Sequence, residues 1–134
     1  MRIRLHLFPL ALLASCSGLL DPGGWDRVAG DISVTEPPIV LPGSVRRGVS
    51  FTATVTTFGS SSCIRPDGAS VRIDGLTAEI TPYDRRAPRN AACTADLHPF
   101  PRPVELRFDQ AGEALIRVRG RSDALYETRI NVSP

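Results

Sequence analysis

The stretch Val49-Ser50-Phe51-Thr52-Ala53-Thr54-Val55-Thr56 decides the fold class of this chain. Apolar residues alternate with hydroxyl-bearing residues along its whole length, so an extended segment has one apolar face and one polar face. A helix would need apolar residues three and four positions apart, and no such period runs through residues 31–134. The stretch therefore predicts a half-buried β-strand, and the following sequence repeats its pattern.

Short alternating runs, separated by turn signals such as Asp74-Gly75 and residues 109–112, continue to the C-terminus. Seven to nine strands at this spacing predict an all-β, antiparallel two-sheet sandwich. The residues expected to face its interior include Val71, Ile73, Leu76, Ala78, Ile80, Val104, Leu106, Phe108, Ala114, Ile116, Val118, Tyr126, Thr128, Ile130 and Val132.

The segment Phe108 to Gly120, together with Thr128 to Val132, resembles the final hairpin of bacterial immunoglobulin-like and fibronectin-like modules. The resemblance implies an immunoglobulin-like sandwich. It implies nothing about function, because many unrelated proteins share this architecture. The chain departs from antibody-type domains, since no Trp stands between Cys63 and Cys93 and both lie in or beside expected loops.

The first sixteen residues, MRIRLHLFPLALLASC, have the organisation of a secretory signal, with two arginines before a short apolar run. The run is too short to span a bilayer, which takes about 20 apolar residues. Leu13-Ala14-Ser15-Cys16 resembles the lipobox of bacterial lipoproteins. The resemblance implies cleavage before Cys16, followed by attachment of a diacylglycerol and an N-acyl chain to that residue. An ordinary signal peptide with Cys16 as a spare residue is the alternative.

The expected organisation has three parts: a signal peptide over residues 1–15, the acylated Cys and a flexible tether over 16–30, and the β-sandwich domain over 31–134. Asp21-Pro22-Gly23-Gly24 breaks regular structure, which favours a tether. By resemblance to proteobacterial lipoproteins, Ser17 favours the outer membrane, on either its periplasmic or its surface face. Trp25 is expected to pack on the first strand or to lie among lipid headgroups.

The charge balance argues against nucleic acid as a partner. All 16 basic residues are Arg, and the chain has 14 Asp and Glu. Two of the arginines precede the expected cleavage site, so the remaining chain is close to neutral. A neutral domain lacks the basic footprint that binding to a polyanion requires.

Cys63 and Cys93 remain as a pair once Cys16 carries lipid, and in an exported protein such a pair predicts a disulfide. Neither has a neighbouring Cys or His at the spacing typical of zinc sites, so no metal is expected. The bond is expected to join the segment after Gly59 to the segment before Leu97.

No catalytic residue and no cofactor beyond the covalent lipid are predicted. His98 is the only His after the expected cleavage site, and the chain has no Gly-x-Ser-x-Gly nucleophile turn. The scattered acids show no calcium-loop spacing and are expected on solvated faces; they are Glu79, Asp84, Asp96, Glu105 and Asp109.

Two segments are candidates for recognition. Tyr83, Arg85, Arg86 and Arg89 are expected to form a cationic loop that contacts lipid headgroups, lipopolysaccharide phosphates or an acidic partner, unless the loop is merely solvated. Phe100 lies in a proline-rich stretch and is expected to act as a lid on the core or to insert into a partner.

These features together predict a lipid-anchored binding or interaction module of the bacterial cell envelope, without catalytic activity of its own. Its expected contacts are the membrane, through the lipid anchor, and an envelope protein or glycan. An exposed strand edge offers a second mode of contact, by strand addition. The alternatives are an envelope enzyme or enzyme inhibitor with its site in the long loops, and a structural subunit of an envelope complex.

Overall fold

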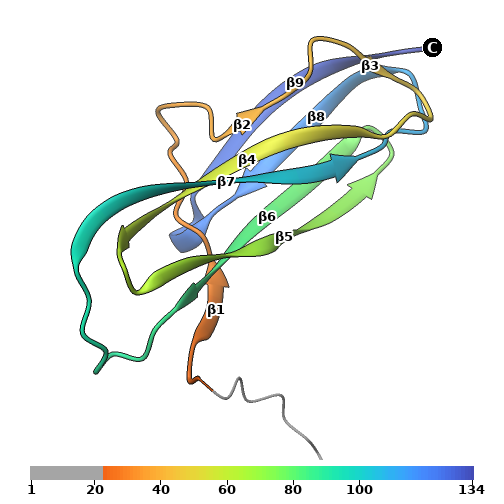
Figure 1. The fold of residues 1–134 in the computed structure, drawn as a ribbon. Helices are drawn as coiled ribbons and strands as arrows, with labels where there is room; N and C mark the ends of the chain where they lie inside the picture. Colours follow the sequence, from red (N-terminus) through yellow and green to blue (C-terminus); the bar gives the residue numbers. More distant parts are fainter. Residues whose placement is uncertain (1–22) are drawn as a thin grey trace, which may run out of the picture.

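The computed structural model describes residues 23–134, which form an all-β sandwich of two sheets (Figure 1). The larger sheet has six strands in the order β1-β6-β8-β9-β3, with β5 on the outer side of β6, and the smaller sheet has the order β2-β4-β7. The predicted two-sheet all-β fold is confirmed. The strands are β1 (Asp26–Ala29), β2 (Ile39–Val40), β3 (Val45–Arg46), β4 (Phe51–Ser61), β5 (Ile64–Asp74), β6 (Thr77–Arg86), β7 (Ala95–Leu106), β8 (Gly112–Arg119) and β9 (Leu125–Ser133).

Two of the strand pairs are parallel, which the predicted antiparallel sandwich did not include. Thr77–Ile80 of β6 runs alongside residues 115–118 of β8 in the same direction, and β3 runs parallel to β9. The chain crosses to the smaller sheet as β7 between β6 and β8, and it therefore returns to the larger sheet in the same direction. Turn signals report only the pairing of strands that follow each other in the chain.

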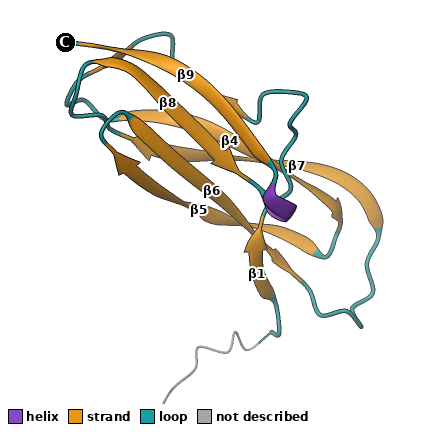
Figure 2. Cartoon of the chain, turned by 180° about the vertical axis from the view of Figure 1, so that it is seen from behind, coloured by secondary structure: helices purple, strands orange, loops and turns teal. Residues whose placement is uncertain are grey.

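The expected alternation of apolar and polar residues along the strands determines which side chains form the core. The fully buried side chains come from both sheets, and the largest include Phe108, Ile80, Leu106, Ile116, Val55, Val118 and Val132. Val49, Val71 and Ile73 are exceptions. Val49 precedes β4 and is 53% exposed. Val71 and Ile73 were expected inside, but they are 39% and 38% exposed because β5 is an edge strand that pairs, among the described strands, only with β6. The only helical segment among residues 23–134 is a 3-10 turn at Arg121–Asp123, drawn purple in Figure 2. None of the described helical structure has the length and apolarity needed to cross a membrane.

Five segments that were expected to be irregular are strands. Residues 26–29 of the expected tether form β1, which pairs with the end of β6. Residues 59–61 extend β4, and residues 64–68 belong to β5, which is bulged between Pro66 and Ala69. Residues 83–86 of the expected cationic loop continue β6. Residues 98–103 belong to β7, which pairs with β4 along its length.

The positions of the prolines in β7 explain how a proline-rich segment can form a strand. The amides of Thr56 and Phe58 in β4 donate to Pro38 and Asp31, on the side away from β7. The odd-numbered residues of β4 therefore form the backbone hydrogen bonds to β7. These residues lie opposite His98, Phe100, Arg102 and Val104. The three prolines alternate with these residues, so their missing N–H groups all fall on the outer edge; they are Pro99, Pro101 and Pro103.

This arrangement predicts that the prolines prevent edge-to-edge association. Replacing Pro99, Pro101 and Pro103 with Thr adds three outward donors to an edge strand, and we expect a larger apparent mass in light scattering than the parent shows at the same concentration. Pro37→Thr is the control, since Pro37 lies outside β7. A triple variant with the parent's mass would contradict this role.

The predicted disulfide is present. Cys63 and Cys93 are bonded, with Cα atoms 5.5 Å apart. Cys63 lies in the turn between β4 and β5, and Cys93 lies in the connection between β6 and β7, so the bond joins two loop regions as expected. Backbone hydrogen bonds reinforce this link, from Ser62 N to Thr94 O (3.1 Å) and from Ala87 N to Cys63 O (3.0 Å).

Candidate binding surface at the N-terminal end of the sandwich

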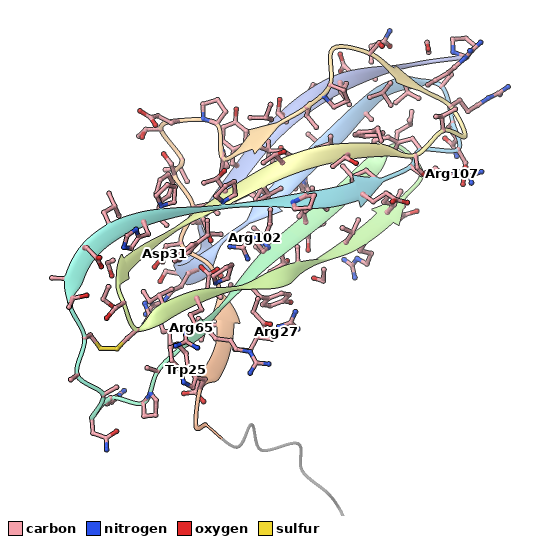
Figure 3. The ribbon with its side chains drawn as sticks, viewed as in Figure 1. Trp25, Arg27, Asp31, Arg65, Arg102 and Arg107 are labelled. Carbon is pink, nitrogen blue, oxygen red and sulfur yellow. A yellow bond between two sulfur atoms is a disulfide. The ribbon has the colours of Figure 1, made fainter. Side chains whose placement is uncertain are left out.

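The described chain enters the sandwich beside a group of arginines. We define the arginine face as Trp25, Arg27, Arg65, Asp67, Tyr83 and Arg85, of which Trp25, Arg27 and Arg65 are labelled near β1 in Figure 3. The predicted signal peptide and the predicted lipidation site, Cys16, lie outside the described residues.

Strand pairing gathers these arginines into one row. Arg85 of β6 lies opposite Arg27 of β1 on one side and opposite Arg65 of β5 on the other. Like charges in directly opposed positions destabilise a sheet. The row therefore needs compensating groups, and the fold supplies a carboxylate and two aromatic rings.

Asp67 provides the carboxylate. It sits in the β5 bulge, where its Oδ2 forms ion pairs with Arg27 Nε at 2.9 Å and with Arg85 Nε at 3.3 Å. The Arg27 guanidinium also lies 3.9 Å from the centroid of the Tyr83 ring, and the Arg65 guanidinium lies 4.3 Å from that of Trp25. Stacking on an aromatic ring offsets positive charge and leaves the edges of a guanidinium able to donate. The face thus remains cationic and rich in donors.

A second cationic site lies beside the disulfide, and we call it the disulfide hollow. It is a surface concavity of about 260 Å³, lined by Ser60, Ser61, Arg86, Arg89 and the two bonded cysteines among others. Arg86 follows Arg85 directly, and successive side chains of a strand point to opposite faces. The basic run at residues 85–89 is therefore divided between the arginine face and the hollow.

A buried ion pair joins the two sheets behind this end. Arg102 of β7 and Asp84 of β6 are 7% and 2% exposed, and Arg102 Nη2 donates to Asp84 Oδ1 at 2.7 Å. Thr57 Oγ1 donates to the same carboxylate oxygen at 3.0 Å and accepts from Arg102. Arg102 Nη1 donates to the carbonyls of Gly68 (2.9 Å) and Tyr83. The prediction that Asp84 lies on a solvated face was wrong, because its position in β6 faces the interior.

The structure thus divides the predicted recognition residues. Tyr83 and Arg85 lie on the arginine face, whereas Arg86 and Arg89 line the hollow. Phe100 is half-buried on β7, and its ring lies so close to Gly59 that a Cβ on that residue would be 2.5 Å away.

Several residues of this end were not among the predicted recognition residues, namely Arg27, Arg65, Asp67, Asp84 and Arg102. A signal existed for the last two. Asp84 continues the inward alternation of Ala78 and Ile80, and Arg102 continues that of Val104 and Leu106, so both stand at core positions.

Other titratable groups lie elsewhere on the sandwich. His98 Nε2 is 2.7 Å from Asp96 Oδ2 at the exposed start of β7. Across the described part of the chain, no three His, Cys, Asp or Glu side chains gather as metal ligands would. On the outer face of the larger sheet, a hydrogen bond from Arg119 to Glu79 (3.2 Å) lowers the pKa of Glu79.

No protein-family model, curated protein or solved structure matches this chain.

Proposed function

We propose that this chain is an exported lipoprotein of the bacterial cell envelope, acylated at Cys16, which acts as a non-catalytic binding module. Its lipobox-like sequence supports the anchor, and Ser17 favours the outer membrane. A diacylglycerol together with an N-acyl chain holds a protein stably on a membrane, whereas a single chain does so only marginally. The lipid is the only cofactor of the proposal.

The observation that carries the binding role is the gathering of arginines where the chain enters the sandwich. Cys16 and Gly23 are seven residues apart, so an extended connection spans at most about 25 Å. An anchor at Cys16 would therefore keep the arginine face close to the membrane surface. Arginines stacked on aromatic rings are suited to carboxylate and phosphate groups, which they bind through two parallel hydrogen bonds.

The expected partner is accordingly acidic and belongs to the envelope: a protein or glycan with carboxylate or phosphate groups, or the membrane surface itself. Nucleic acid is not expected, since the chain after Cys16 has as many acidic as basic side chains. The charge that matters is local to one end of the sandwich, not spread over the domain.

The first test is the intact mass of the protein extracted without reductant from the membranes of a bacterial host. We expect a chain that begins at Cys16, carries acyl groups, and lacks two hydrogens because of the Cys63–Cys93 bond. Cys16→Ala should abolish acylation and remove the acyl mass from the protein. A species cut elsewhere, with Cys16 unmodified in the parent, would overturn the proposed anchor.

A further inference from the structure

We propose that the disulfide hollow binds the phosphomonoester group of an acidic lipid headgroup. The inference rests on the proposed function in one respect, that the N-terminal end of the sandwich faces a membrane. The hollow and the arginine face then have different roles, since the face supplies general attraction to an acidic surface and the hollow supplies recognition of one group.

The hollow is built from fixed walls. The β4–β5 turn forms one wall and the connection from Ala87 to Thr94 forms the other, and the disulfide ties the two together. Two hydrogen bonds between Ser62 and Thr94, at 3.1 and 3.0 Å, hold the same junction. Because the backbone of both walls is already tied together, only the side chains need ordering when a ligand arrives, and less entropy is lost on binding. The volume of about 260 Å³ is several times the roughly 30 Å³ of one water molecule.

The groups that line the hollow are donors suited to an anion. Arg89 is exposed in the connection between β6 and β7. Arg86 is only loosely held, because its Nη2 lies 3.8 Å from Asp31 Oδ2, and Asp31 also faces Arg121 at 3.7 Å. Ser61 Oγ accepts from the Cys63 amide at 3.2 Å, which leaves its hydroxyl proton able to donate outward.

This donor set fits a phosphomonoester better than a phosphodiester. A phosphomonoester carries a charge of about −1.5 to −2 at neutral pH and three terminal oxygens. Two guanidinium groups can each bind such oxygens through paired hydrogen bonds, and the serine hydroxyls add further donors. A phosphodiester offers a single charge and fewer free oxygens, so it would leave part of the donor set unused.

The test is vesicle cosedimentation of residues 16–134 with Cys16→Ser, a chain that contains every described residue and cannot be acylated. The vesicles are phosphatidylcholine alone, or the same lipid with phosphatidic acid or with phosphatidylglycerol at equal surface charge. We expect the tightest binding to phosphatidic acid. Arg86→Ser with Arg89→Ser should weaken this binding about tenfold. The matched control, Arg46→Ser with Arg47→Ser, removes the same charge at β3 and should leave binding within about twofold.

Two further experiments separate the effect of charge from that of guanidinium geometry, and binding of a lipid from binding of a free anion. Lys at positions 86 and 89 keeps the charge but not the planar fork, and it should remove the preference for phosphatidic acid over phosphatidylglycerol. Inorganic phosphate at millimolar concentration should compete only weakly, since it lacks the surrounding membrane. Equal losses in the two serine variants, no preference between the acidic lipids, or tight binding of inorganic phosphate without vesicle binding would each overturn the proposal. The mass measurement above tests the anchor independently of all these results.

Discussion

Replacing Asp84 with Ala will lower the free energy of unfolding by about 3–5 kcal/mol, because it leaves the Arg102 guanidinium buried without its counter-ion. The loss is a large share of the 5–15 kcal/mol that is usual for a single domain. Thr57 also loses the acceptor of its hydroxyl proton, although it keeps its contact with Arg102. Equilibrium unfolding in urea, followed by circular dichroism, measures the change.

The matched control removes both charges. Asp84→Leu combined with Arg102→Met replaces the ion pair with apolar side chains, and we expect the double variant to be more stable than Asp84→Ala alone. The reason is that an unpaired buried charge is more destabilising than the loss of the whole pair. If Asp84→Ala costs less than about 1 kcal/mol, the ion pair is not held in the interior as the structure places it.

Replacing both Cys63 and Cys93 with Ser will lower the free energy of unfolding by about 3.5 kcal/mol. The bond closes a loop with a sequence separation of 30 residues, and the estimate is the loop-closure entropy that the cross-link removes from the unfolded chain. Reduction of the parent protein should give the same loss, which makes it the control for the serine substitutions. A loss shared by both preparations but below 1 kcal/mol would contradict a structural role for the bond.

The strands with clean alternation could be predicted from the sequence, because the residues that define them lie next to each other in the chain. Ala114, Ile116 and Val118 are fully buried, and the hairpin at Gly75 has the positive φ (+58) that its Asp-Gly signal implies. Most of the core positions follow from the local alternation of apolar residues, and the disulfide follows from the number of cysteines. Neither requires knowledge of which strands pair at a distance.

The errors have a common physical cause. Residues 83–86 and 98–103 were expected to lie in loops, because charge and proline are rare in strands. In the folded chain, other strands supply the neighbours that allow charge and proline in these strands. Asp67 of β5 forms an ion pair with Arg85, and β4 forms backbone hydrogen bonds only with the non-proline residues of β7. The arginine face could not be predicted, since Arg27, Arg65 and Arg85 come together only through the pairing of β1, β5 and β6.

The proline spacing of β7 also determines how its amides exchange with heavy water. Between His98 and Val104, every residue that has an amide proton directs it toward β4, and the residues between them have none. An edge strand ordinarily contains a slow amide and a fast amide in alternation. This stretch should show slow amides only, at positions 98, 100, 102 and 104, so by hydrogen exchange it should resemble a strand from the middle of a sheet.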